Sequence, residues 1–158
     1  MLEIELNYET EDMEEMFCEY TDMLVNLNPV FAECLKNQNY NSELEYLEDK
    51  YGLPQGRLYL ARFDGKKAGC IGLRKLDDEK CEMKRLYVKP EFRGQRIAHQ
   101  LIGRIIEDAK DIGYKSMFLD TMPDLKSAVK LYENYGFERI GAYYENPIDT
   151  EIYMKLEL

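Results

Sequence analysis

Residues 82–98 read EMKRLYVKPEFRGQRIA, and apolar residues at helical spacing continue from there to Ile112. The residues up to Val88 predict a strand, Pro90 suits its end because proline cannot donate to a ladder, and a short basic turn then leads into a helix. Backbone N–H groups at the start of a helix have no partner within it and lie at the positive end of the helix dipole. The turn from Arg93 to Ala98 is therefore predicted to hold a phosphate group.

The elements after this turn predict a parallel pair of strands. The helical stripe ends at Gly113, which suits the left-handed residue after a helix, and Lys115–Asp120 reads as a short strand. A helix that connects two strands of one sheet makes them parallel, so this strand is expected to run parallel to the one that ends at Val88. The remaining predictions are a helix over Pro123–Tyr135 that stops at Gly136, and strands over Phe137–Tyr144 and Glu151–Leu156 separated by Asn146-Pro147.

The elements before the turn complete an α/β pattern. Leu2–Leu6 alternates as a strand, and an amphipathic helix with an acidic outer face follows, capped by Thr10 and closed by Asn28-Pro29. A less regular helix is expected over Ser42–Tyr51, with Leu44 and Leu47 inward. Three antiparallel strands are then predicted over Leu58–Phe63, Ala68–Leu76 and Lys80–Val88, the first two joined by a tight turn at Asp64-Gly65.

Length and composition favour a single domain over residues 1–158, since 45% hydrophobic residues supply enough apolar surface for one core. The N-terminus lacks a signal-peptide pattern and no window resembles a membrane span, so a cytoplasmic protein without a membrane partner is expected. The chain has one histidine, His99, and its four cysteines are Cys18, Cys34, Cys70 and Cys81. Because the cysteines form no C-x-x-C pair, no metal site and no disulfide framework are predicted.

The net charge of −10 is concentrated at one end of the chain, because residues 1–35 contain ten acidic side chains and no Lys or Arg. Such a field repels nucleic acid, and the only basic cluster, Lys84–Arg104, is short, so no nucleic-acid partner is expected. The acidic helix raises the hypothesis that Glu14, Glu15 and Glu19 attract a cationic substrate. The alternative is that they form only a solvated surface.

Two motifs in order carry a resemblance that spans nearly the whole chain. The turn Arg93-Gly94-Gln95-Arg96-Ile97-Ala98 is followed by Ala128-x-x-Leu131-Tyr132-x-x-x-Gly136-Phe137, and together they resemble the GNAT superfamily of acyl-CoA-dependent N-acetyltransferases. The resemblance implies a mixed, splayed sheet of about seven strands flanked by about four helices. It also implies acetyl-CoA as cosubstrate and direct transfer to a primary amine of a small molecule or peptide. Arg96 departs from the family where the turn has its second glycine, and Leu125 departs where many members have asparagine.

The family's cofactor contacts are expected on two segments of this chain. The strand end is expected to pair with pantetheine amides, and the Val88 N–H is the usual donor to the thioester carbonyl. The turn is expected to hold the pyrophosphate through its N–H groups, with Gly94 allowing the bend and Arg96 offering an added guanidinium. These predicted cofactor residues are Leu86, Tyr87, Val88, Arg93, Gly94, Gln95, Arg96, Ile97 and Ala98.

For the chemistry, the resemblance places Tyr132 beside the sulfur as general acid, and a phenol of pKa near 10 is protonated at neutral pH. Glu82, on the strand that leads into the turn, is the predicted base acting through water, with Glu145 as its rival. Tyr143 and Tyr144 are expected either to line the acceptor pocket or to serve in packing or a dimer contact.

Two alternatives to acetyl transfer stay open. One is a catalytically silent acyl-CoA-binding module, and the other is transfer of a different acyl group. His99 is expected to be a surface side chain, and a homodimer is compatible with the sequence.

Overall fold

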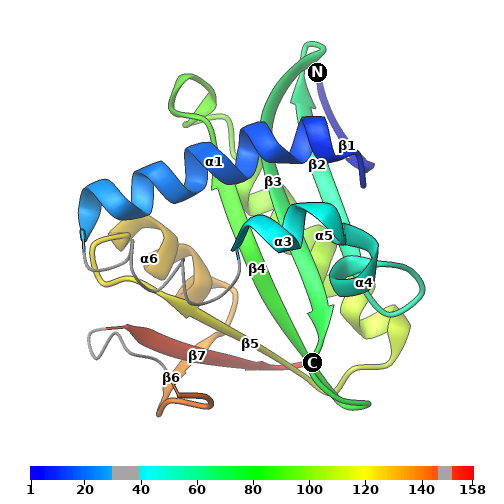
Figure 1. The fold of residues 1–158 in the computed structure, drawn as a ribbon. Helices are drawn as coiled ribbons and strands as arrows, with labels where there is room; N and C mark the ends of the chain where they lie inside the picture. The colour runs from blue at the N-terminus through cyan, green and yellow to red at the C-terminus, as the bar shows by residue number, and fades with distance from the viewer. Residues whose placement is uncertain (30–39, 146–150) are drawn as a thin grey trace.

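The structure is a computed structural model that describes residues 1–29, 40–145 and 151–158. One sheet of seven strands is flanked by α-helices, of which five lie in the described ranges (Figure 1). The elements in chain order are β1 Leu2–Leu6, α1 Thr10–Leu27, α3 Tyr40–Glu45, α4 Leu47–Tyr51, β2 Arg57–Phe63, β3 Lys66–Lys75, β4 Lys80–Val88, the 3-10 turn η1 Pro90–Phe92, α5 Ile97–Ile112, β5 Ser116–Thr121, α6 Lys126–Asn134, β6 Glu138–Ile140 and β7 Ile152–Glu157. The mixed α/β architecture with about seven strands is confirmed.

The sheet has the strand order β1-β2-β3-β4-β5-β7-β6, and β4 and β5 are its parallel pair. These two strands pair only over three positions, from Lys80 opposite Ser116 to Glu82 opposite Phe118. Beyond that point the two strands separate, so the sheet is splayed as predicted. Among the described residues, no strand pairs with the outer half of β4 on that side.

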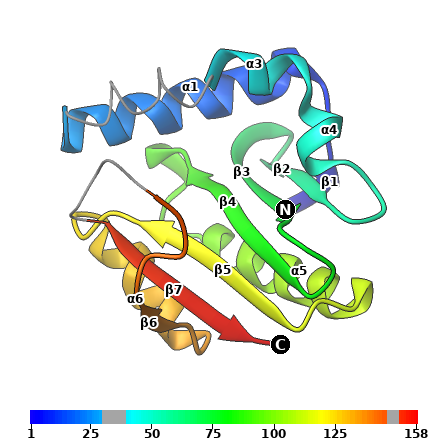
Figure 2. The ribbon, with the colours of Figure 1, turned by 60° about the horizontal axis from the view of Figure 1, so that its bottom comes forward.

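Helices cover both faces of the sheet, with α1, α3 and α4 on one face and α5 and α6 on the other (Figure 2). Alternate residues of β2 show how one strand serves two cores. Leu58 and Leu60 pack with Phe17 of α1 and Tyr51 of α4, whereas Tyr59 and Ala61 pack with the apolar stripe of α5. The two cores therefore fix where α1 and α5 lie relative to the split between β4 and β5.

Several predicted boundaries are corrected by the structure. Thr10 does not cap α1, because its hydroxyl donates to the Leu44 carbonyl oxygen at 3.1 Å and so ties α1 to α3. The helix expected over Ser42–Tyr51 is two short helices, α3 and α4, and Leu44 and Leu47 do point inward. The helix expected from Pro123 begins at Lys126.

The strand expected over Phe137–Tyr144 contains only β6, because Tyr143 and Tyr144 turn away to bind carboxylates on β4 and β5. The turn predicted at Asp64-Gly65 is confirmed by positive φ angles of 52° and 82° at its two residues. The predicted turn at Asn146-Pro147 and the thiol of Cys34 lie outside the described residues.

The described cysteines are free thiols. Cys70 and Cys81 are buried, and burial raises the pKa of each thiol to about 12, so both stay protonated and pack as small apolar groups. Across the described ranges, no helix combines the length and apolarity that crossing a membrane requires.

Candidate active site

Two cavities meet where β4 and β5 separate. The inner cavity, of about 520 Å³, extends between α1, the outer half of β4, the end of β5 and the start of α6. The outer cavity, of about 500 Å³, lies between the start of α5 and the end of α6. The residues that line both are Val88, Arg93, Gly94, Ala98 and Leu131. The inner cavity therefore continues past the predicted phosphate turn into the outer cavity.

The turn before α5 offers its backbone to the cavities. Arg96, the residue before this helix, makes no side-chain capping hydrogen bond, so the N–H groups of the first turn are open to a ligand. Gly94 has a φ of +87°, and a side chain placed there would meet nothing within 4 Å. A ligand phosphate can therefore approach the backbone closely, and the helix dipole favours its charge.

Arg96 shows why glycine is preferred at its position. It has φ 60° and ψ 26°, the left-handed region, which costs a residue with a side chain about 1–2 kcal/mol. Its side chain lines the outer cavity and its charge acts on Tyr135, so the guanidinium lies on the side of the turn that faces this cavity. The backbone of Arg96 therefore has the left-handed conformation that glycine adopts readily, and its side chain adds a positive charge to the turn.

Arg96→Gly is expected to raise the free energy of unfolding by about 0.5–1 kcal/mol, because relief of the left-handed strain exceeds the entropy that glycine adds to the unfolded chain. Urea denaturation checks this value. The same variant should bind coenzyme A more weakly if the guanidinium contacts phosphate, which isothermal titration measures. Gly141→Ala, at a position without steric neighbours, serves as a backbone control.

The strand end predicted to hold pantetheine lies along the inner cavity. Leu86, Tyr87 and Val88 all line it, and none of them pairs with β5. The Tyr87 hydroxyl donates to Glu19 at 3.2 Å, and the Arg93 guanidinium donates through Nε to the Val88 carbonyl oxygen at 3.1 Å. The side chain of Arg93 therefore bridges the turn and the strand end.

Tyr132 lies in the wall of the inner cavity, on α6. Its ring packs edge-on against Phe137 with the centroids 5.8 Å apart, and its side chain is buried. Burial, and then the nearby Tyr20 and Asp120, raise its pKa well above the ordinary value, so the hydroxyl stays protonated. No described residue forms a hydrogen bond with this hydroxyl. A protonated hydroxyl therefore lies at the cavity with no hydrogen-bond partner among the described residues.

Glu82 does not line either cavity. It is buried, with Oε1 2.9 Å from Arg74 Nε and 3.6 Å from Lys84 Nζ, and Oε2 accepts a hydrogen bond of 2.5 Å from the Tyr143 hydroxyl. The structure thus places Tyr132 at the cavity and Glu82 behind its wall. Lys84, which pairs with Glu82, does line the inner cavity.

A carboxylate that the sequence did not single out does reach the inner cavity. Asp120, the next-to-last residue of β5, lines the cavity together with Tyr144 and Glu151 and accepts a hydrogen bond from the Tyr144 hydroxyl. Burial opposes its charged form, but hydrogen bonds from Glu151 and Tyr144 and the charge of Lys84 outweigh this and lower the pKa of Asp120. Asp120 is therefore ionised at neutral pH.

The other predicted residues divide between the cavities and their surroundings. Tyr144 lines the inner cavity, whereas Tyr143 packs between Phe118 and Tyr153. Glu145 is exposed and lines neither cavity. His99, expected as a surface side chain, is half-buried and lines the outer cavity, with the centroid of its ring 5.1 Å from that of Tyr135.

The acidic face of α1 is partly neutralised in the structure. Lys89 Nζ lies 3.1 Å from Glu15 and 3.2 Å from Glu19, so two of the acids proposed to attract a cation are paired beside the turn. The hypothesis that this face attracts a cationic substrate therefore rests on a smaller charge than the sequence indicates.

Comparisons with known proteins agree with this geometry. Residues 12–137 match the profile of the Acetyltransferase (GNAT) family. An uncharacterized N-acetyltransferase of Schizosaccharomyces pombe is 42% identical over 130 residues, which cover 81% of this chain and 80% of that protein.

Among solved structures, an acetyltransferase from Streptococcus agalactiae has a TM-score of 0.79 at 22% identity, over 99% of this chain and 98% of that one. A GNAT family acetyltransferase from Elizabethkingia anophelis, solved with acetyl-CoA bound, has a TM-score of 0.57 at 30% identity, over 66% of this chain and 77% of that one. The extent of the profile match and the 42% identical relative, together with the splayed strands, mean that this chain belongs to the acetyltransferase (GNAT) family.

Proposed function

We propose that this protein is an N-acetyltransferase that moves an acetyl group from acetyl-CoA to a primary amine by direct transfer. One observation carries the proposal: the protonated Tyr132 hydroxyl faces a cavity that continues to the open N–H groups of α5. The bound acetyl-CoA in the Elizabethkingia anophelis structure supports this choice of donor.

The donor is proposed to lie along both cavities. Its pyrophosphate would be held by the N–H groups of the turn from Arg93 to Ala98, with the guanidinium of Arg96 adding charge. Its pantetheine amides would pair with the free edge of β4 at Leu86–Val88. The thioester would then lie in the inner cavity near Tyr132.

The proposed reaction is a single displacement at the thioester carbon. The amine lone pair attacks the carbonyl, whose oxygen the Val88 N–H would polarise, so a C–N bond forms and the C–S bond breaks. The acceptor ammonium group loses one proton to solvent before the attack and its nitrogen loses a second one afterwards, while the leaving thiolate gains one proton, so no other reactant is needed. Tyr132 is proposed to donate to the sulfur as its charge develops.

For the amine proton, Asp120 fits better than Glu82. Asp120 is ionised and lines the cavity, so it can accept a hydrogen bond from the acceptor ammonium group and take up its proton through water. Glu82 lies behind Lys84 and is bound by Arg74 and Tyr143. We therefore propose that Glu82 holds Lys84 and Tyr143 in place and that Asp120 meets the amine.

Asp120→Asn is expected to lower kcat/KM for the amine about tenfold, because a charge-assisted hydrogen bond to the acceptor is lost. Steady-state rates with the amine varied at saturating acetyl-CoA measure this effect. Glu82→Gln is the comparison variant. A larger loss in Glu82→Gln than in Asp120→Asn, with both folded by circular dichroism, would restore Glu82 as the base.

Two measurements test the proposed function as a whole. Thermal shift with coenzyme A tests the donor site, and release of free thiol across a panel of amino acids, polyamines and peptide N-termini tests transfer. Binding of coenzyme A without turnover of any amine would favour the catalytically silent module. Repeating the assay with longer acyl-CoA donors tests the alternative that another acyl group is moved.

A further inference from the structure

Lys84 and Asp120 lie on opposite sides of the split between β4 and β5. The last paired positions are Glu82 and Phe118, and Lys84 and Asp120 each follow two residues later on their strands. Residues two apart on a strand point to the same face. Met83 precedes Lys84 and Leu119 precedes Asp120, and both of these apolar residues pack in the core on the α5 side. Lys84 and Asp120 therefore point to the face covered by α1, α3 and α4.

Both side chains line the inner cavity, yet no ion pair joins them in the described structure. They are close enough for the charge of Lys84 to lower the pKa of Asp120. A cation and an anion are thus presented to one cavity with room between them.

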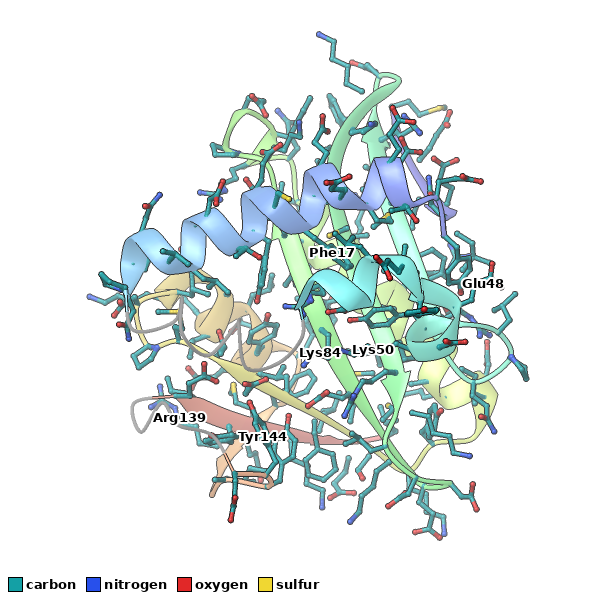
Figure 3. All side chains as sticks on the ribbon, viewed as in Figure 1. Phe17, Glu48, Lys50, Lys84, Arg139 and Tyr144 are labelled. Atoms are coloured by element: carbon teal, nitrogen blue, oxygen red, sulfur yellow. The ribbon has the colours of Figure 1, made fainter. Side chains whose placement is uncertain are left out.

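The positive side of this arrangement belongs to a cluster of lysine and arginine side chains. Figure 3 shows Lys84 on β4 and Lys50 on α4, and ion pairs connect both lysines to a buried cluster. The four cations are Lys50, Arg74, Lys84 and Arg85, and the carboxylates that pair with them are Glu43 and Glu82. In the printed ion pairs of the described residues, each of these two carboxylates is therefore shared by a lysine and an arginine, and Asp120 acts on Lys84 from across the split.

The arginines take the close contacts in the cluster. Arg85 Nη2 lies 2.5 Å from Glu43 Oε2 and Arg74 Nε lies 2.9 Å from Glu82 Oε1, whereas the lysine contacts to the same carboxylates are 3.5 Å for Lys50 and 3.6 Å for Lys84. The lysine side chains are only 26% and 21% exposed. Each lysine is therefore largely buried, and the carboxylate that it contacts is closer to an arginine than to the lysine.

Burial and the crowding of positive charge lower the pKa of Lys50. Burial, and next the charge of Lys84, lower the pKa of Lys50 to about 8, with Arg85 and Arg74 acting in the same direction and Glu43 opposing them. An anion bound at Lys84 would relieve this repulsion. Binding there would therefore gain energy from the cluster as well as from Lys84 itself.

We infer that the acceptor in the proposed acetyl transfer is a small amine that also carries a carboxylate, with its carboxylate bound at Lys84 and its ammonium group at Asp120. An α-amino acid is the simplest such molecule. The inner cavity of about 520 Å³ must also hold the acyl end of the donor, which limits the acceptor to a small molecule. The inference rests on the proposed transfer, and its test separates the two.

The test compares matched acceptors in the thiol-release assay: the common amino acids, their primary carboxamides, and the corresponding amines without a carboxyl group. The carboxamide keeps the amine but removes the carboxylate charge. The wild-type protein is expected to use at least one amino acid with a KM about tenfold or more below that of its carboxamide. Equal use of both would overturn the inference and leave the proposed function intact.

Lys84→Gln is expected to raise the KM for that amino acid about tenfold, without changing the KM for its carboxamide or the Kd for coenzyme A. Lys84→Arg should restore most of the affinity, and Lys80→Gln, on the exposed start of the same strand, should change neither KM. An equal rise for the acid and the carboxamide would also overturn the inference. Failure with every amine, while coenzyme A still binds, would overturn the proposed function instead.

Discussion

Tyr132→Phe is expected to lower kcat about 10³-fold while the Kd for coenzyme A changes less than about twofold. The loss arises because the leaving thiolate would develop its charge without a proton donor, at a cost of about 4 kcal/mol in the transition state. The ring itself keeps its packing against Phe137, and the hydroxyl has no hydrogen-bond partner among the described residues. Stability should therefore be almost unchanged.

Single-turnover kinetics with preloaded acetyl-CoA, together with a direct titration of coenzyme A, separate the two effects. Tyr114→Phe is the matched control, because it removes the hydroxyl of another buried tyrosine. This hydroxyl donates to the Gln55 carbonyl oxygen at a distance of 2.7 Å, and Tyr114 lines neither cavity. A Tyr132→Phe protein with wild-type kcat would contradict the acid assignment.

The pH profile offers a second check on Tyr132. Because burial raises its pKa, the hydroxyl does not ionise in the neutral or mildly alkaline range, so activity should show no loss from this group below about pH 10. A loss of kcat near pH 8 or 9 that disappears in Tyr132→Phe would show that the group titrates there.

The parts of the fold that local patterns control could be predicted from the sequence. The strand, turn and helix from Glu82 to Ile112 form as expected, since glycine, proline and apolar spacing act within a few residues. The backbone of Arg85 shows the limit of this reading. It has a φ of 60° at a bulge where β4 carries one residue more than β3, and arginine gives no signal for a left-handed conformation.

The residues of the candidate site also fall into those that sequence motifs mark and those that only the fold brings together. Motifs in the sequence mark Tyr132 and the turn, whereas Asp120 is brought to the same cavity only by the register of β4 and β5. A general rule offered one signal, since residues at the carboxyl ends of parallel strands tend to line binding sites. Glu82 precedes the turn, which favours it in the sequence, but its ion pair with Arg74 is known only when β3 is placed beside β4.

The second large effect is expected from Glu43→Gln, which should lower the free energy of unfolding by about 3 kcal/mol at pH 7. Burial opposes the charged form of Glu43, but Arg85, Lys50 and the Tyr51 hydroxyl outweigh this and lower its pKa from 4.5 to about 2. A difference of this size corresponds to about 3 kcal/mol. Removing the charge would also leave the Arg85 guanidinium buried among Lys50, Lys84 and Arg74, which adds to the loss.

The sign of the pH dependence distinguishes this effect from a simple packing loss. The folded-state pKa of Glu43 is below the unfolded value, so its contribution is complete above about pH 4.5 and disappears as the pH falls toward 2. The difference in unfolding free energy between wild type and Glu43→Gln should shrink over that window, as urea denaturation at a series of pH values would measure. Glu45→Gln, an exposed neighbour on α3, should show little difference at any pH. A difference for Glu43→Gln that stays constant down to pH 2 would mean that shape, and not charge, is what this carboxylate contributes to the cation cluster behind the cavity.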